Sequence, residues 1–409
     1  MGRAIHTDQV GLHIPAPVRS RPVWSLGTGV EGFVFTAGQP GVGAGGAIAS
    51  GIEQQTLQAY ENLRAILEEG GLSFSDVVKT RIFVTKPEDY EEMTKVRTPY
   101  YEQHFPDGQY PASTALVTPL AVPGLLIEIE AIACADKRAF DTEEIAKLIP
   151  LPLAVQPLWR LGVETQGLLW TTGQPGFDLE AKVVGPDIAS QTRRSLENLE
   201  SIVVAGGFEF TDVVKLNTFI TEPDDFPAML EVRNEFIAER FGGGGYPTAT
   251  TIVVGFPPEP MRVETEAVAV KGEKTVVPTE QLFARLPTGG PSSLSSQAVR
   301  SGGWVFTSGQ GALDSAGDVV GRDDIAAQTA NALENVGAVL RAAGAGFDDI
   351  VKMTVWLGDA ELYDEMTQAR MPLYQEAFSG GEPPAGTAVI ASSPVEGLLI
   401  ELEAVAYVG

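Results

Sequence analysis

Cysteine and histidine are both scarce in this sequence of 409 residues. Cys134 is the single cysteine, so no disulfide can form within the chain and no metal site can be built from several cysteines. Such cysteine use is typical of the reducing cytoplasm, where we expect the protein to reside. The three histidines all lie in the first third of the chain, which excludes a histidine-based metal or catalytic site that recurs along it.

Long apolar runs and basic residues are also few. No stretch approaches the roughly 20 apolar residues that a membrane helix needs, and the N-terminus lacks the apolar core of a signal peptide. We therefore expect a soluble protein with no membrane partner. Lys and Arg total 28 against 54 Asp and Glu, a net charge of −26. Because nucleic-acid affinity depends on neutralising phosphates with Lys and Arg, we expect no nucleic-acid partner.

Four short motifs recur three times in the same order, about 136 residues apart. They are T-x-G-Q (Thr36–Gln39, Thr171–Gln174, Thr307–Gln310), Q-T-x4-E-N (Gln55–Asn62, Gln191–Asn198, Gln328–Asn335), D-[VI]-V-K (Asp76–Lys79, Asp212–Lys215, Asp349–Lys352) and E-x-E-A-[IV]-A (Glu128–Ala133, Glu264–Ala269, Glu401–Ala406). The chain therefore consists of three tandem repeats, which we place at 1–136, 137–271 and 272–409.

Each repeat is predicted to be an α/β unit with the order β-β-α-β-α-β-β. In the first repeat, a helix with Leu57, Leu63, Ile66 and Leu67 on one stripe ends at the glycine pair 70–71, as helices commonly do. A β-branched strand follows at 77–85, then a second helix over about 89–104 and strands at 114–118 and 125–133. In the last strand the two motif glutamates point to one face, because side chains alternate along a strand.

A mixed sheet with two helices on one face leaves its other face uncovered. We expect the three units to bury these faces by closing around an axis, as an intramolecular pseudo-trimer with three clefts between neighbouring repeats. A chain of this kind is expected to be monomeric, with a further homodimer left open. The segments near 136–151 and 271–286, rich in proline and charge, are interpreted as linkers that lead into the next repeat.

The four motifs together resemble those of the RidA/YjgF family of enamine/imine deaminases, across nearly the whole chain. The resemblance implies a chorismate-mutase-like fold, ligand sites at subunit interfaces, and no metal or organic cofactor. It also implies an arginine after the Y/F-P-A motif that holds the substrate carboxylate. This sequence has Ser113, Ala249 and Gly386 at that position, so all three repeats lack the arginine.

The other functional positions that the resemblance implies are partly retained. The water-positioning glutamate of the last strand is assigned to Glu130, Glu266 and Glu403, our candidate catalytic residues. The alternative is a structural carboxylate paired across an interface. The aromatic cover of the pocket is assigned to Trp24 and Trp159, with Ser295 in the third repeat; both tryptophans are equally compatible with packing. A polar helix position is assigned to Thr98, Asn234 and Met371, of which Asn234 is a candidate substrate ligand.

Three further sets of residues are candidates from the sequence itself. An arginine recurs on the second helix as Arg97, Arg233 and Arg370, and it is either a relocated anion clamp or, the interpretation that we favour, a salt bridge to the abundant acids. Ser113 and Thr114 are candidate hydrogen-bond donors to a ligand. For the mid-strand lysines, which are Lys79, Lys215 and Lys352, structural pairing is favoured over Schiff-base chemistry.

The leading functional hypothesis is a RidA-like hydrolase or deaminase that acts on a small imine, enamine or amide-like compound. A strand glutamate in a cleft between repeats would position the water. Two alternatives stay open. One is a catalytically silent pseudo-trimer that binds small molecules or serves as a scaffold, and the other is an isomerase-type enzyme with one active cleft.

Overall fold

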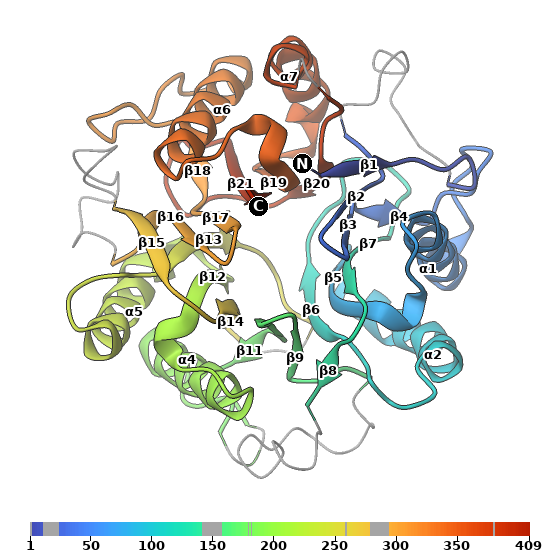
Figure 1. Ribbon diagram of the computed structural model, residues 1–409, viewed down its shortest axis with the longest axis horizontal. Helices are drawn as coiled ribbons and strands as arrows, with labels where there is room; N and C mark the ends of the chain where they lie inside the picture. The colour runs from blue at the N-terminus through green and yellow to red at the C-terminus, as the bar shows by residue number, and fades with distance from the viewer. Residues whose placement is uncertain are drawn as a thin grey trace.

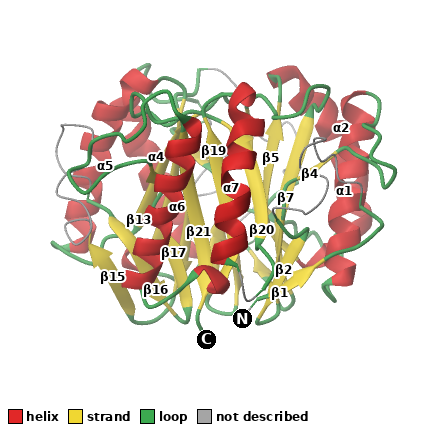
Figure 2. Cartoon of the chain, turned by 90° about the horizontal axis from the view of Figure 1, so that it is seen from above, coloured by secondary structure: helices red, strands yellow, loops and turns green. Residues whose placement is uncertain are grey.

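The computed structural model describes residues 2–10, 24–140, 158–178, 180, 182–257, 260–278, 294–378 and 381–409. Three similar units follow one another around a central axis, with their sheets inside and their helices outside (Figures 1 and 2). The predicted pseudo-trimer of α/β units is therefore confirmed. The predicted linkers lie partly outside the described residues, at 141–157 and 279–293.

The first unit contains the elements β1 (Arg3–Ile5), β2 (Gly27–Val30), β3 (Phe33–Thr36), β4 (Gln39–Pro40), α1 (Gly51–Glu69), β5 (Val77–Val84), α2 (Pro87–His104), β6 (Ala112–Val117) and β7 (Ile127–Cys134). The second contains β8 (Arg138–Ala139), β9 (Gly162–Thr165), β10 (Leu168–Thr171), β11 (Gln174–Pro175), α4 (Ile188–Ala205), β12 (Val213–Ile220), α5 (Phe226–Phe241), β13 (Thr248–Val253) and β14 (Val263–Val270). The third contains β15 (Lys274–Pro278), β16 (Ser296–Ser301), β17 (Trp304–Thr307), β18 (Gln310–Gly311), α6 (Ile325–Ala342), β19 (Ile350–Leu357), α7 (Tyr363–Ala377), β20 (Ala385–Ile390) and β21 (Ile400–Tyr407).

Each sheet has seven strands, in the order β1-β2-β3-β7-β5-β6 in the first unit, with β4 also paired to β7. The pair β5–β6, joined through α2, is parallel, whereas β7 runs antiparallel to both β3 and β5. The short strand β4, which begins at the glutamine of the T-x-G-Q motif, was not predicted. It has only two residues, too few to give a periodic pattern.

The first helix of each unit ends as the sequence predicts. Gly71, Gly207 and Gly344 have positive φ angles of 84°, 83° and 76°, a conformation that glycine adopts without steric cost. Leu63, Ile66 and Leu67 of α1 are fully buried against the sheet. The assignment of Leu57 to the buried stripe is wrong, because this side chain is 40% exposed. In the first turns of the helix the buried positions are instead Gln55, Thr56 and Ala59, and Leu57 lies beside this stripe.

The inner faces of the three sheets form a layered core along the axis. One apolar layer contains Phe35, Trp170 and Phe306, one from each repeat, and a second contains Phe83, Phe219 and Trp356. Backbone bridges also join the repeats, from Val117 to Gly255 and from Val253 to Ser392. Lys352 of the last repeat donates to the carbonyl of Thr36 in the first, at 2.7 Å, so the ring of units is closed.

Candidate functional sites

A layer of buried charge surrounds a small cavity on the axis, about 60 Å³ in volume, between the two apolar layers. Each mid-strand lysine forms an ion pair with a glutamate of the following repeat. The pairs are Lys79–Glu266 at 2.7 Å, Lys215–Glu403 at 2.8 Å and Lys352–Glu130 at 2.8 Å. Each lysine also donates to a threonine hydroxyl, that of Thr114, Thr250 or Thr387, and to a backbone carbonyl of the following repeat. The predicted structural pairing of these lysines is thus confirmed.

Arg81 breaks the threefold symmetry of this layer. Its guanidinium donates to Glu266 Oε1 and lies 3.4 Å from Glu130 and 3.5 Å from Glu403. The equivalent position is Asn217 in the second repeat, which donates to Glu403, and Thr354 in the third. One arginine therefore contacts all three glutamates.

The structure corrects the predicted location of Glu130, Glu266 and Glu403. They lie together at the axis, not one in each cleft, and they are only 4–7% exposed. Burial by itself raises the pKa of each carboxyl, but the neighbouring lysine and Arg81 outweigh this effect and lower it, for Glu266 to about 2. A carboxylate held ionised by two cations is a weak proton acceptor, so this geometry favours the structural alternative.

The first glutamate of each E-x-E motif lies away from the axis. Glu128, Glu264 and Glu401 lie on the same sheet face, two residues from the axis set, and their carboxyls lie against the motif glycines Gly38, Gly173 and Gly309. A Cβ on these glycines would come within 1.7–1.8 Å of the glutamate Oε1 atoms. The T-x-G-Q glycine therefore provides the space that each carboxyl occupies.

Burial raises the pKa of these glutamates, and the nearby axis glutamate raises it further. The pKa reaches about 8 for Glu128 and Glu264. For Glu401 it is about 7, because Ser393 donates a hydrogen bond to this carboxyl. These groups exchange protons near neutral pH, as a general acid or base must. The two glutamates of one strand thus have opposite pKa shifts. The pKa is lowered in the axis set, which favours the ionised form, and raised in the cleft set, which favours the protonated form.

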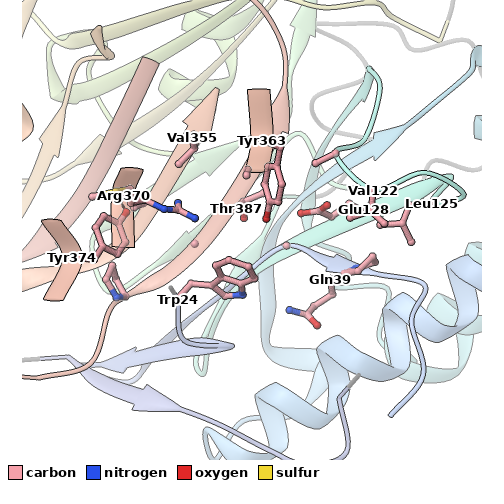
Figure 3. Close-up of a pocket in the computed structure, with 17 residues that line it drawn as sticks. Trp24, Gln39, Val122, Leu125, Glu128, Val355, Tyr363, Arg370, Tyr374 and Thr387 are labelled. Carbon is pink, nitrogen blue, oxygen red and sulfur yellow. Dashed lines mark hydrogen bonds between the residues drawn. The ribbon is translucent and has the colours of Figure 1, made fainter. Parts of the chain in front are cut away.

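We name the lateral clefts by the repeats that they separate. The 3–1 cleft holds Glu128 and Trp24 from the first repeat and Arg370, Tyr363 and Tyr374 from the third, around a cavity of about 80 Å³. Figure 3 shows Glu128, Tyr363, Arg370 and Trp24 surrounding this cavity from different sides. Trp24 and Arg370, predicted as substrate ligands, are therefore brought together, with the arginine carbon Cζ 5.9 Å from the ring centroid.

The other two clefts are built from the equivalent positions but differ in chemistry. In the 1–2 cleft, Cζ of Arg97 lies 5.5 Å from the ring centroid of Tyr90 and 5.6 Å from that of Trp159. In the 2–3 cleft, Arg233 lines a cavity of about 110 Å³ together with Ser295 and Glu401. Burial lowers the pKa of Arg233 to about 10.

The salt-bridge interpretation of the helix arginines is wrong for Arg97 and Arg370. Across the described ranges of the chain, neither forms an ion pair, and each has at least one buried guanidinium nitrogen without a hydrogen-bond partner. Arg233 donates to Thr251. All three point from the second helix of their repeat towards a lateral cleft, an arrangement compatible with the anion-clamp interpretation.

The remaining predicted ligands are engaged within the protein. Thr114 belongs to the axis layer, where its hydroxyl contacts Lys79 and Glu266. The Ser113 hydroxyl accepts from Thr80, and its amide donates to Thr172 across the repeat boundary. Asn234 accepts from the Leu294 amide, which places its carboxamide oxygen against the backbone of the third repeat.

The cleft glutamates were the functional candidates that the sequence prediction missed. The signal was present, since the first glutamate of E-x-E recurs as regularly as the second. Strand alternation places both on one face and does not say which of them reaches the axis. Within the residues that the structure describes, no cluster of three metal-ligating side chains is found, and none of the described helices is long and apolar enough to span a membrane.

Three α/β units closed around an axis, each with a glutamate in a cleft towards its neighbour, define a pseudo-trimeric protein with candidate sites at the internal interfaces. A family model described as endoribonuclease L-PSP matches residues 16–135, 151–271 and 291–408. The chain belongs to this family, and it consists of three fused RidA/YjgF-like units.

Curated relatives match single repeats. The putative reactive intermediate deaminase TdcF of Escherichia coli K12 is 34% identical over 110 residues, 27% of this chain and 84% of the relative. The 2-iminobutanoate/2-iminopropanoate deaminase of Dermatophagoides farinae is 33% identical over 128 residues, 30% of this chain and 95% of the relative. A chorismatase crystal structure, 13% identical, superposes with a TM-score of 0.53 over 81% of this chain and 93% of its own, which is a likeness of fold.

Proposed function

We propose that the protein is a hydrolase that removes ammonia from a small imine or enamine, with a lateral-cleft glutamate as the proton-transferring group. Deaminase relatives that match a stretch about as long as one repeat support the reaction class. The observation that carries the assignment within this chain is Glu128. It lines the 3–1 cavity, and burial raises its pKa to about 8.

The reaction requires one group that first donates and then accepts a proton. The protonated carboxyl of Glu128 gives its proton to the imine nitrogen, and the carboxylate then takes a proton from the water that attacks the imine carbon. The carbinolamine that forms has a new C–O bond. The carboxyl then returns its proton to nitrogen, and the resulting carboxylate takes the hydroxyl proton as the C–N bond breaks. The products are a carbonyl compound and ammonia, and Glu128 is protonated again. A pKa near the working pH suits both directions of transfer.

A small molecule is a better candidate substrate than RNA, even though the family description names an endoribonuclease. With a net charge of −26, the protein repels a phosphate backbone. Moreover, four of its cations, Lys79, Lys215, Lys352 and Arg81, are consumed by glutamates at the axis. We expect no cleavage of single-stranded RNA by the protein under conditions in which an imine is hydrolysed.

The test compares the two sets of glutamates. Imines generated in place from amino acids would be offered to the wild type and to Glu128→Gln, Glu264→Gln and Glu401→Gln, with Glu130→Gln as the control for the axis layer. Loss of ammonia release in one cleft variant, at unchanged circular dichroism, would identify the working cleft. Full activity in all three would refute the proposal. Ligand binding without turnover in the wild type would favour the silent binding protein instead.

A further inference from the structure

We infer that the 3–1 cleft binds an organic anion whose charged group is held by Arg370 from helix α7 and whose flat part lies against Trp24. The inference rests on the proposed function, because it specifies the substrate class of the same cleft. Its starting point is Arg370, which lines the cavity while only 5% exposed. The Nε and Nη2 atoms of this side chain have no hydrogen-bond partner.

The surroundings of Arg370 do not neutralise it. The groups that face it around the cavity are Trp24, Tyr363, Tyr374 and Glu128 (Figure 3). Glu128 is the single carboxyl among them, and it forms no ion pair with the arginine in the described structure. A buried guanidinium without a counter-charge is costly, whereas a carboxylate can accept two parallel N–H bonds from its planar fork. An anionic ligand would supply what the protein leaves out.

The arginine position that the family motif implies is closed in this cleft. Gly386 stands there, and a Cβ on Gly386 would lie 3.2 Å from Trp24 Cβ, which is tighter than an ordinary contact. The base of the Trp24 side chain, with Cβ at 3.2 Å and Cγ at 3.8 Å, thus occupies the space through which a longer side chain would leave the strand. The cation is instead provided by α7, two residues before Pro372. The anchor has moved from the strand to the helix, and the ligand must lie between this helix and Glu128.

The other clefts provide matched comparisons. Arg97 is enclosed by the rings of Tyr90 and Trp159 and donates to Thr94. Arg233 donates to Thr251 and faces Ser295 where the first two repeats have tryptophan. Arg370 also lies over two rings, those of Trp24 and Tyr374, but both its Nε and its Nη2 have no hydrogen-bond partner, against Nε alone for Arg97. The 3–1 cavity therefore offers a flat anion an aromatic surface together with two guanidinium donors. This combination makes Arg370 a specificity-determining residue.

The experiment measures the binding of benzoate and of benzamide, its uncharged analogue, to the full chain by calorimetry. We expect benzoate to bind at least about tenfold more tightly than benzamide, as a charge-assisted pair would give. Arg370→Gln should remove this preference while leaving benzamide within about twofold. Arg370→Lys should retain part of it, which guards against misfolding of the glutamine variant. Trp24→Leu should weaken both ligands, and Arg233→Gln should change neither.

Benzoate affinity that is the same in Arg370→Gln as in the wild type would overturn the inference, as would the absence of benzoate binding by the folded wild type. Glu128→Gln separates the two proposals. If this variant still binds benzoate but loses imine turnover, both stand. If Glu128→Gln loses turnover while Arg370→Gln binds benzoate as tightly as the wild type does, only the anion site fails. If its turnover is unchanged while benzoate depends on Arg370, only the role of the glutamate fails.

Discussion

The protonation of Glu264 in the folded protein makes a direct prediction about stability. Glu264 is 7% exposed, and burial, reinforced by the charge of Glu266, raises its pKa from 4.5 to about 8 against the smaller opposing effect of Lys79. The folded state therefore holds a proton that the unfolded chain releases above pH 4.5. Its contribution to stability is present below that pH and is lost as the pH rises towards 8.

The magnitude follows from the two pKa values. At about 1.4 kcal/mol per pH unit, the loss between pH 4.5 and 8 has a ceiling of about 5 kcal/mol. We expect about half of it, because water and neighbouring dipoles relax around a buried carboxylate. Glu264→Gln keeps the shape and cannot ionise. The variant should match the wild type in urea unfolding at about pH 5 and exceed it by about 2–3 kcal/mol at about pH 8.

The control is Glu231→Gln, which replaces an exposed glutamate of α5 and should leave the pH dependence of the free energy of unfolding unchanged. Curves for Glu264→Gln and the wild type that run parallel from pH 5 to pH 8 would show that Glu264 is ionised throughout. That result would refute the reasoning for the cleft glutamates as a group.

Three further predictions concern packing and the axis. Lys352→Met should lower the free energy of unfolding by about 3–5 kcal/mol, because Glu130 then lacks its lysine partner. The double variant Lys352→Met/Glu130→Leu should recover part of this stability. Equal losses in the single and the double variant would contradict the pairing argument. Gly38→Ala should abolish the chemistry of the 3–1 cleft by displacing the Glu128 carboxyl, whereas Gly45→Ala, with open space around it, should retain activity in the same ammonia assay. Leu63→Ala should cost about 2–5 kcal/mol in urea unfolding, and Leu57→Ala, at a 40% exposed position, should cost far less; similar values would refute the assignment of the buried stripe.

Local sequence patterns predicted most of the secondary structure of each unit. They did not predict the contacts between side chains where two repeats meet. The glycine stops at Gly71, Gly207 and Gly344 were predictable because they satisfy a local backbone requirement. The face shared by Glu128 and Glu130 was predictable because strand alternation is a local rule. Leu57 was misplaced because the buried stripe of the first helical turns is formed by Gln55, Thr56 and Ala59, which are polar or small and carry a weaker hydrophobic signal than a leucine beside the stripe.

The helix arginines illustrate the same limit. Their recurrence as Arg97, Arg233 and Arg370 was visible in the sequence, and an ion pair was the reasonable expectation in so acidic a chain. The structure instead turns them towards lateral clefts, where Arg370 meets Trp24 from a segment nearly 350 residues away. Residues so far apart in the sequence can be predicted to be neighbours only if the order of the units around the axis is known.

The sequence by itself determined the threefold repeat, the α/β content of each unit and the residue types at each recurring position, since these depend on local periodicity and on motifs in register. Only the tertiary structure decided that the second glutamate of each E-x-E pair forms an ion pair with lysine at the axis, while the pKa of the first is raised towards neutral pH in a cleft. The physical reason is that a carboxyl's state depends on the charges and burial around it. Here those surroundings are supplied by the neighbouring repeats.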